Sequence, residues 1–476
     1  MKLTVFNGTD KHLPFSQSAS KSSSKSVVVS EASALLGESD LAIPPHASTT
    51  TTISKKTLTI VIKALEAGEG VTAGSGHHAA HKLHVKLGAR WKSVRASEGF
   101  PWRIYSSKIS KGHYKLSVLP QRNLASFLSE MPDSLPLSSL VLPGTHDTMA
   151  FYGWPFSQCQ SSSTTLDIQL ASGIRVIDIR LAVINGALIA YHGVWPERTP
   201  FQEMLSAINT FLTAPATSSE TIVMSIKQED YNTTPLPLFS QTVHDEIMNG
   251  PGGFAMWFLE NRIPTLGEVR GKVVMLSRFG GDGSGWTNGL EGLGIHPTAW
   301  PDSDKAGFTW TLKGTLVRTQ DWYDIPSFLS IPEKMQLSSE NLVLPTGAQS
   351  QPILNISFFS AANIPLALPT TIARGFGWPQ WKLGFEGVNA RLGSWLIDNL
   401  PGSTTGSGGQ DPAQTTPTGA TEKDATSAGD GTSDADDVRI RGWAMTDFYA
   451  DPDDSVVPLL VEWNFQNRKS GEEGWP

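Results

Sequence analysis

The sequence has very little cysteine and no long apolar run. Cys159 is the only cysteine among 476 residues, so no intramolecular disulfide can form. No apolar run approaches the roughly 18–20 residues that a membrane-spanning helix needs, and no apolar stretch typical of a secretory leader follows Met1. We therefore expect a soluble protein without a signal peptide, either cytoplasmic or exported by a non-classical route, that contacts membranes only peripherally.

The charge is distributed unevenly along the chain. The net charge is −8, yet residues 1–120 contain 16 Lys and Arg against 7 Asp and Glu, which gives +9 and leaves −17 for the rest. A basic module beside an acidic one could lie on an anionic lipid surface. The same charges are also compatible with an ordinary solvated surface, and the sequence leaves both interpretations open.

Two regions with different patterns are present, and the length is sufficient for two domains. Residues 1–118 contain short alternating stretches separated by Ser-, Thr- and Gly-rich turns, which predicts a small all-β, sandwich-like accessory domain. From residue 119 to 476, helical stretches such as 201–212 and 237–248 alternate with apolar strands. This alternation predicts an irregular (β/α) TIM-like barrel, an α/β fold.

Residues 401–437 interrupt the second region. They consist of Gly, Ser, Thr, Ala, Asp and Pro with seven acidic residues and one lysine. Such a segment buries too little apolar surface to offset its ordering entropy, so it is predicted to be disordered. The segment after it is too short for a domain, and its strand-like residues 439–446 are expected to form the last barrel strand. The disordered segment is therefore interpreted as an acidic insertion within the barrel.

Three predicted strands end in charged or titratable residues. Pro-Gly-Thr-His-Asp (143–147) follows one apolar strand, Asp-Ile-Arg (178–180) ends the next, and His192-Gly193 ends a third. The carboxyl ends of barrel strands form the rim at which chemistry takes place. We therefore expect His146, Arg180 and His192 to meet at one rim.

This order of motifs resembles the X domain of phosphatidylinositol-specific phospholipases C, and the single-domain bacterial enzymes most of all. The resemblance continues through the segments that end at Lys227 and Arg278, through Thr-Gln-Asp-Trp-Tyr (319–323) and through Gly-Trp-Ala-Met-Thr-Asp-Phe-Tyr (442–449). It covers about residues 130–465 without the insertion. It implies a phosphodiesterase that cleaves the glycerol–phosphate bond of phosphatidylinositol and yields diacylglycerol and a cyclic inositol phosphate.

The resemblance also implies a role for each site residue. His146 would be the general base that takes the proton of the inositol 2-hydroxyl, and Asp447 would orient its ring. His192 would be the general acid, assisted by Asp147. Two imidazoles suit these roles because their ordinary pKa lies near neutrality.

The position of Arg180 bears on the cofactor. Calcium-dependent relatives have Asn after the first histidine and acidic ligands on the following strand, whereas this chain has Asp147 and Arg180. A guanidinium can meet the charge of a phosphodiester without a metal, so no metal and no other cofactor is expected, and Asp178 would position neighbouring groups. The residues that fall where the family binds the inositol ring are Lys227, Arg278, Asp321 and Tyr323.

The expected partners are phosphatidylinositol or a related inositol lipid and the membrane surface, without nucleic acid, for a chain expected to be a monomer. Two aromatic stretches, 151–156 and 376–381, could enter the bilayer interface or serve as ordinary core contacts. One alternative function is a glycerophosphodiester phosphodiesterase, which normally pairs its first histidine with arginine and adds carboxylates for a metal. The other is a non-catalytic lipid- or carbohydrate-binding protein with a vestigial barrel.

Overall fold

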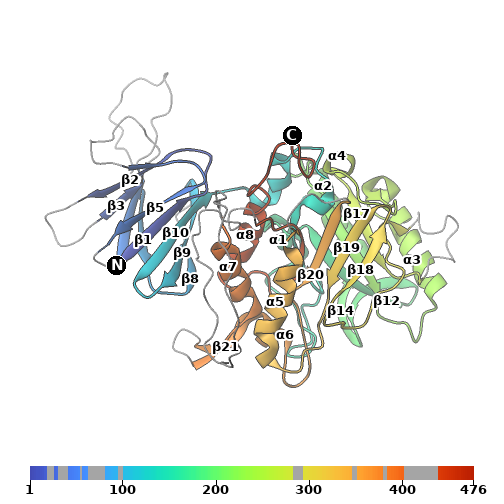
Figure 1. The fold of residues 1–476 in the computed structure, drawn as a ribbon. Coiled ribbons are helices and arrows are strands. Elements are labelled where there is room, and N and C mark those ends of the chain that lie inside the picture. Colours follow the sequence, from blue (N-terminus) through green and yellow to red (C-terminus); the bar gives the residue numbers. More distant parts are fainter. Residues whose placement is uncertain are drawn as a thin grey trace, which may run out of the picture. The chain divides into compact units, whose positions relative to one another are not determined.

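The computed structural model divides the chain into two units, and each is described here by itself (Figure 1). The described residues are 1–18, 26–29, 41–53, 56–62, 81–94, 100–281, 293–345, 351–378, 383–400 and 438–476. The first unit takes its described residues from 1–88, 105–118 and 398–438, and the second from 89–104, 119–397 and 439–476. The predicted insertion, 401–437, lies outside the described residues.

The regular structure described in the first unit consists of β-strands, as the turn-rich pattern of its sequence predicts. They belong to two sheets, ordered β5-β1-β10-β9-β8 and β4-β2-β3-β6-β7, and β8 (Trp91–Val94) is the edge strand of the first. The strands are β1 (Lys2–Asn7), β2 (Leu13–Ser18), β3 (Ser26–Val29), β4 (Leu41–Ile43), β5 (Ala47–Thr52), β6 (Thr57–Ile62), β7 (His81–Lys86), β9 (Trp102–Ser110) and β10 (His113–Pro120).

The division between the units differs from a simple boundary at residue 118. Residues 89–104, which include β8 (Trp91–Val94), belong to the second unit. Within this unit, Nε1 of Trp91 donates a hydrogen bond of 2.6 Å to the carbonyl of Ala390. Its ring also lies so close to Gly393 that a Cβ there would come within 2.3 Å of it.

The second unit is built on one large sheet that curls into an incomplete barrel. The order is β16-β17-β15-β12-β11-β23-β20-β19-β18, and all neighbours from β16 to β19 are parallel. The strands of this order are β11 (Val141–Thr145), β12 (Val176–Ile184), β15 (Ile222–Gln228), β16 (Trp257–Phe258), β17 (Val273–Arg278), β18 (Phe308–Leu312), β19 (Thr315–Gln320), β20 (Ile353–Phe358) and β23 (Gly442–Thr446). Among the described residues no ladder joins β16 or β17 to β18 or β19, so the expected irregular, TIM-like barrel is confirmed in this open form.

Helices connect and cover these strands. They are α1 (Leu166–Ala171), α2 (Phe201–Thr213), α3 (Leu236–Asn249), α4 (Leu266–Val269), α5 (Ile331–Leu342), α6 (Pro369–Arg374), α7 (Val388–Asp398) and α8 (Val456–Glu462), with 3₁₀ turns η1 (Leu124–Glu130), η2 (Leu137–Ser139), η3 (Gly253–Met256) and η5 (Phe328–Ser330). In α2 the buried positions recur every three or four residues, so one face packs on the sheet. None of the helices among the described residues is long and apolar enough to cross a bilayer.

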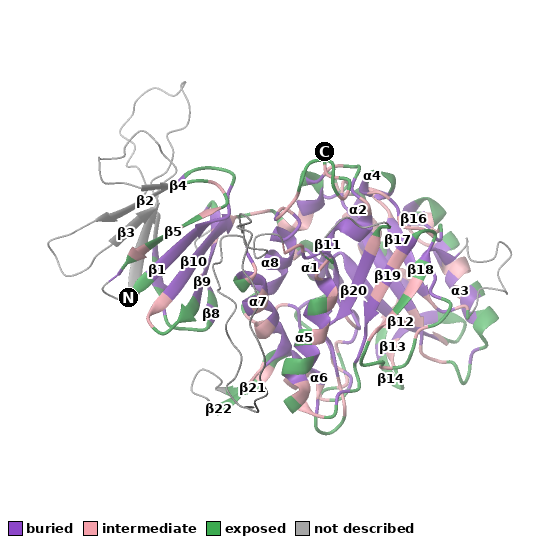
Figure 2. Ribbon diagram, in the orientation of Figure 1, coloured by how far each residue is buried: buried purple, intermediate pink, exposed green. Residues whose placement is uncertain are grey.

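The core lies along the parallel strands. Every residue of β11 and β23 is buried, and β15 and β17 are buried almost throughout. Of these strands, β11 and β17 are labelled in Figure 2, where buried residues are purple. Sheets covered on both faces favour such continuous apolar runs. The position of β23 between β11 and β20 agrees with the prediction that a strand after the insertion completes the barrel sheet, although it begins at Gly442 and not at residue 439.

One predicted strand direction is wrong. Residues 187–191 were expected to form the third successive strand of a parallel barrel. Instead β13 (Ala187–His192) returns antiparallel to β12, with Leu181 opposite Ala190, and continues into β14 (Trp195–Pro200). The two-residue turn Asn185-Gly186 explains this, because both residues have positive φ, as a tight hairpin requires.

Candidate active site

A cavity of about 670 Å³ lies at the carboxyl ends of the parallel strands. Eight of the ten residues predicted for the site line it: His146, Arg180, His192, Lys227, Arg278, Asp321, Tyr323 and Asp447. The other two, Asp147 and Asp178, are buried beside it at 2% and 0% exposure. The barrel therefore brings all ten positions together at one edge, although they span three hundred residues of sequence.

The pairing of β11 with β23 explains how His146 meets Asp447. In this parallel ladder Thr145 lies opposite Thr446, so the residues that follow are neighbours. The backbone N–H of His146 donates to the carbonyl of Thr446 at 3.0 Å. A Cβ on Gly144 would come within 2.5 Å of the sulfur of Met445 and 3.0 Å of Val176, so a larger residue would have to displace these neighbours.

The two ring nitrogens of His146 have different partners. Nδ1–H donates to the carboxylate of Asp447 at 2.9 Å. Nε2 lies 3.0 Å from a terminal nitrogen of Arg180, and since a guanidinium can only donate, Nε2 accepts. These contacts assign a neutral imidazole with its lone pair on Nε2, toward the cavity-lining arginine.

His192 is held differently, because both of its nitrogens face acceptors. Nδ1–H donates to the carbonyl of Ser157 at 2.8 Å, and Nε2 lies 3.0 Å from the carboxylate of Asp147. A ring that donates at both nitrogens is an imidazolium. The hairpin of β12 and β13 brings His192 here, since its register returns the end of β13 to the level of Arg180.

Asp147 connects the three cationic or basic groups of the site. One carboxylate oxygen forms an ion pair with Nε of Arg180, and the other lies 3.0 Å from His192 and 3.5 Å from His146. Its backbone has a φ of 41°, in the left-handed region that aspartate tolerates better than most residues. Its backbone N–H points at Asp178, 3.4 Å away.

These contacts also shift the pKa values of the site, and for His146 the shift opposes the neutral form that its contact with Arg180 favours. Burial disfavours the charged form of Asp147, but Arg180, His146 and His192 outweigh it and hold the pKa of that carboxyl well below its usual range. Burial also disfavours protonation of His192, and the attraction of Asp147 overcomes it and raises the pKa. The pKa of His146 is raised in the same way against burial, by Asp147 and Asp447.

The residues predicted to bind the inositol ring form a second group in the cavity. Arg278 lies 3.5 Å from Asp178 and 3.7 Å from Asp321, and its guanidinium stacks 4.1 Å from the ring centre of Trp300. Lys227 pairs with Glu229 at 3.2 Å, and the pKa of Lys227 is lowered by the nearby Arg180 and by burial.

Tyr323 is partly exposed at the cavity edge, and its hydroxyl donates to Asp302. Burial and this aspartate raise the pKa of Tyr323 to about 12. The hydroxyl therefore remains protonated at neutral pH and can serve as a hydrogen-bond donor.

Three residues of the site were not predicted. Glu229 accepts from Arg180 at 3.1 Å and from the backbone of Gly193 at 3.2 Å, and it joins β15 to the β13–β14 turn. Glu229 directly follows β15, and an acid in that position is too common to indicate a site. Trp300 donates to Asp321 at 2.8 Å, and Asp302 holds Tyr323. Both come from the long connection between β17 and β18, whose sequence has no motif.

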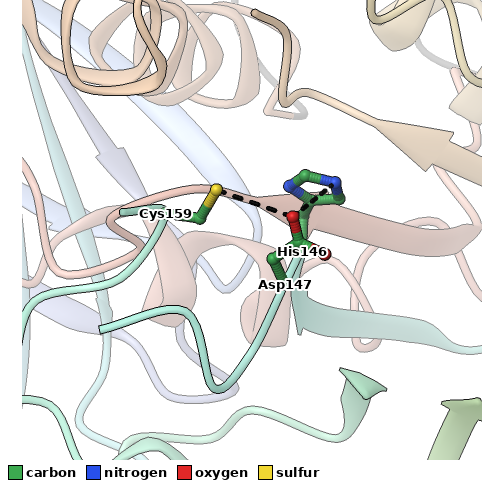
Figure 3. Close-up of side chains that lie close together, drawn as sticks. All are labelled: His146, Asp147 and Cys159. Carbon is green, nitrogen blue, oxygen red and sulfur yellow. Dashed lines mark hydrogen bonds and ion pairs between the residues drawn. The ribbon is translucent and has the colours of Figure 1, made fainter. Parts of the chain in front are cut away.

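One group among the described residues has the donor set of a metal site: His146, Asp147 and Cys159, drawn in Figure 3. The thiol of Cys159 lies 3.7 Å from Asp147, and burial raises the pKa of this thiol well above its usual range. Arg180, however, forms the ion pair with Asp147 and contacts His146. Its permanent positive charge occupies the place that a divalent cation would take, so this donor set does not fit one.

In the second aromatic stretch predicted as a membrane contact, Phe376 is 43% exposed and packs against two phenylalanines from outside the stretch. Phe376, in β21 (Gly375–Trp378), stacks 5.5 Å from Phe385 in β22 (Leu383–Glu386), and both rings contact Phe328. Residues 379–382 lie outside the described residues. The first stretch is different, since Trp154 is 74% exposed.

Known proteins are similar to parts of this chain. Residues 134–279 match the family model "Phosphatidylinositol-specific phospholipase C, X domain". A 1-phosphatidylinositol phosphodiesterase of Listeria monocytogenes is 34% identical over 163 residues, which cover 32% of this chain and 48% of that protein. One of Staphylococcus aureus is 27% identical over 210 residues, which cover 42% and 64%.

These matches span about half to two thirds of the length of the curated relatives. Among solved structures, a double mutant of the phosphatidylinositol-specific phospholipase C of S. aureus superposes with a TM-score of 0.51 at 18% identity, and covers 73% of this chain and 98% of that one. At this identity the likeness shows the fold alone. The resemblance to the X-domain family and the barrel fold are thus both confirmed.

Proposed function

We propose that this chain, whose residues 134–279 match the X-domain family model of phosphatidylinositol-specific phospholipases C, is a phosphatidylinositol phosphodiesterase that works without a metal ion. The observation that carries this proposal is the difference between the hydrogen-bond partners of the two histidines. His146 accepts at Nε2, while His192 donates at both nitrogens. One side chain is thus ready to take a proton and the other to give one.

The reaction follows from this pair. Nε2 of His146 removes the proton of the inositol 2-hydroxyl, and the resulting oxygen attacks phosphorus. The bond to the glycerol oxygen breaks, and this oxygen receives the Nε2 proton of His192. The products are diacylglycerol and inositol 1,2-cyclic phosphate. Water can then open the ring in a slower step, in which His192 acts as base and His146 as acid.

Asp447 and Asp147 support the two roles. Asp447 fixes the tautomer of His146 through Nδ1 and stabilises the imidazolium that forms when the ring accepts a proton. Asp147 keeps His192 protonated through Nε2 before the leaving oxygen takes its place. The buried Asp178 supports this arrangement through its ion pair with Arg278 and through the hydroxyl of Ser225, which donates to Asp178 at 2.8 Å.

Arg180 supplies the positive charge that other phosphodiesterases obtain from a metal. Its guanidinium lies in the cavity, contacts both Asp147 and His146, and has a pKa held well above its usual range against burial, chiefly by Asp147 and Glu229. Terminal N–H groups directed at the phosphate oxygens would stabilise the charge of the transition state. No divalent cation enters this mechanism.

The inositol ring would occupy the part of the cavity between Lys227, Arg278, Asp321 and Tyr323. The two cations can donate to ring hydroxyls, Asp321 can accept from them, and the aromatic ring of Tyr323 offers a face for stacking. This arrangement favours inositol lipids over other head groups. Trp300, which holds both Arg278 and Asp321, keeps these two groups in position.

Three exposed hydrophobic residues, Trp154, Val194 and Trp195, are together the proposed contact with the lipid surface and are called the hydrophobic patch. These side chains are 74%, 86% and 46% exposed, and Val194 and Trp195 follow His192 by two and three residues. Exposed apolar side chains beside a catalytic cavity suit a membrane interface, where tryptophan is favoured. The patch would hold the cavity mouth at the head groups of a bilayer.

The test is turnover of phosphatidylinositol vesicles with and without an excess of EDTA. We expect the same rate in both, since Arg180 carries the charge that a metal would carry. Loss of activity with EDTA, restored by a divalent cation, would contradict the metal-independent mechanism and favour a glycerophosphodiester phosphodiesterase. No turnover by the folded protein in either buffer would contradict the proposed activity.

A further inference from the structure

We propose that Glu197 is a positioning residue for His192: its buried carboxylate fixes residues 152–157 so that the carbonyl of Ser157 accepts the Nδ1 proton of His192. Glu197 lies in β14, outside the cavity, and does not contact His192 or the place of the substrate. The effect of Glu197 on the orientation of His192 does not depend on the proposed function. Its catalytic consequence rests on the role of His192 as general acid in the proposed function.

The first link is between Glu197 and the aromatic segment. The side chain of Glu197 is 1% exposed. One carboxylate oxygen accepts from the backbone N–H of Tyr152 at 2.8 Å, and the other lies 3.5 Å from the hydroxyl of Ser157. A single carboxylate thus holds both ends of the segment, whose middle residue Trp154 is exposed.

The second link is between the segment and the acid. Ser157 is 2% exposed, and its hydroxyl donates to the carbonyl of Tyr152 at 3.2 Å, which closes the segment into a loop. Its own carbonyl accepts from Nδ1 of His192 at 2.8 Å. This bond decides the orientation of the ring, because it turns Nε2 toward Asp147, and it favours the protonated ring.

A carboxylate is otherwise unexpected at this position. Burial raises the pKa of Glu197, and the hydrogen bonds from the backbone of Tyr152 and Phe151 only partly oppose it. Burying an acid without a paired cation costs free energy. The neighbouring Arg198 stacks 4.5 Å from the ring of Tyr152 and forms no ion pair with Glu197 among those described. A role in holding the loop explains why the acid is there.

Several charged groups act on His192, so the test must separate them. Asp147 lies 3.0 Å from Nε2, and the thiol of Cys159 lies 4.0 Å from Nδ1. Arg180 opposes protonation, while Asp447 and Glu197 attract the charged ring. Removing the charge of Glu197 would therefore lower the pKa of His192 even without any positioning effect.

Two substitutions at Glu197 distinguish the effect of its charge from the effect of its position. Glu197→Gln removes the charge but keeps an acceptor for Tyr152 and a group that can contact Ser157. Glu197→Asp keeps the charge but shortens the side chain by one methylene, so it cannot reach both ends of the loop. Glu203→Ala is the control, since Glu203 is an exposed acid in the first turn of α2. Circular dichroism and thermal unfolding verify that each variant is folded.

The primary measurement is the pKa and tautomer of His192 by NMR of protein with ¹⁵N-labelled histidine, assigned with His192→Ala. We expect Glu197→Asp to lower this pKa by about half a unit to one unit and to weaken the Nδ1 hydrogen bond. Glu197→Gln should retain most of the wild-type value, and Glu203→Ala all of it. A larger shift in Glu197→Gln than in Glu197→Asp, or no shift in either, would overturn the proposal.

Kinetics on a soluble short-chain phosphatidylinositol give the second readout. Glu197→Asp should lower kcat about tenfold with KM nearly unchanged, because the general acid is displaced while substrate contacts remain. The alkaline limb of its pH profile should move to lower pH, as the acid loses its proton earlier. If the wild type did not cleave the lipid, the proposed function would fail, yet the NMR result would still decide the role of Glu197.

Discussion

At the scale of single residues, the site depends on two histidines that differ only in their hydrogen-bond partners. His146 faces a carboxylate on one side and a guanidinium on the other, whereas His192 faces a backbone carbonyl and a carboxylate. The donor and acceptor pattern therefore assigns base and acid without reference to substrate. Their rings lie 6.5 Å apart, which leaves space between them for a phosphodiester.

The first prediction separates the two roles by leaving group. His146→Ala and His192→Ala should each lower kcat on phosphatidylinositol by about 10² or more. With an aryl inositol phosphate, whose leaving group needs no proton, His192→Ala should recover most of its activity and His146→Ala should not. His244→Ala, a change on the partly exposed α3, is the matched control. Equal losses of both variants on both substrates would contradict the assignment.

The second prediction concerns the pH dependence of stability. The pKa of Asp147 is lowered on folding, so its stabilisation is present above its unfolded pKa and is lost as pH falls through its folded value. The pKa values of His146 and His192 are raised on folding. The stabilisation from these two rings is therefore present below their unfolded pKa near 6.5 and is lost as the pH rises through their folded pKa values.

Asp147→Asn should therefore reduce the free energy of unfolding most between about pH 4 and 6.5, by about 3–5 kcal/mol, since it leaves buried cations unpaired. The reduction should shrink as the pH rises through the folded pKa values of the two histidines, because the rings then lose their charge. Denaturant titrations at a series of pH values measure it. A reduction that stays constant from pH 5 to pH 9 would argue against the coupling of Asp147 to the histidines.

At the scale of elements, strand pairing determines which predicted residues meet. The sequence was sufficient to expect His146, Arg180 and His192 at strand ends, because apolar runs bounded by charged residues mark the ends of buried strands. It was not sufficient for the direction of β13, since alternation identifies a strand but not its partner. Nor could it reveal Glu229, because an acid after a strand is common on any surface.

The third prediction concerns the hydrophobic patch of Trp154, Val194 and Trp195. Trp154→Ala should weaken partition onto phosphatidylinositol vesicles about tenfold, because a large exposed indole leaves the interface. Activity on a monomeric short-chain substrate should stay within about twofold, since no atom of Trp154 lines the cavity.

Met248→Ala is the control for this patch. Met248 is 46% exposed near the end of α3, whereas Leu236 at the start of that helix lines the cavity. Since an α-helix rises about 1.5 Å per residue, Leu236 and Met248 lie roughly 18 Å apart along α3. Equal loss of vesicle binding in both variants would show that the patch has no special role.

At the scale of the whole molecule, a buried ion pair lies at the start of the barrel strands, at the end opposite the site. Arg175 and Glu220 are both fully buried and lie 2.7 Å apart. Arg175 also donates to carbonyls of Leu170 and Ala125, so it joins η1, α1, β12 and the segment before β15. The proposed catalytic residues thus lie at one end of the sheet, and the buried pair of Arg175 and Glu220 lies at the other.

The fourth prediction tests this second end. Glu220→Ala should lower the free energy of unfolding by about 3–5 kcal/mol, because it leaves a buried guanidinium without its partner. Glu333→Ala removes the exposed pair with Lys305, where both side chains are about half exposed, and should cost less than about 1 kcal/mol. Chemical denaturation measures both. Similar costs for the two variants would contradict the assigned importance of the buried pair.

The measurement that tests the central claim most directly is the identity of the first product, followed by ³¹P NMR with phosphatidylinositol vesicles in EDTA. If His146 activates the inositol 2-hydroxyl and His192 protonates the glycerol oxygen, the first new resonance must be inositol 1,2-cyclic phosphate, with the acyclic phosphate appearing later. Direct appearance of inositol 1-phosphate, without the cyclic ester at any time, would contradict the account.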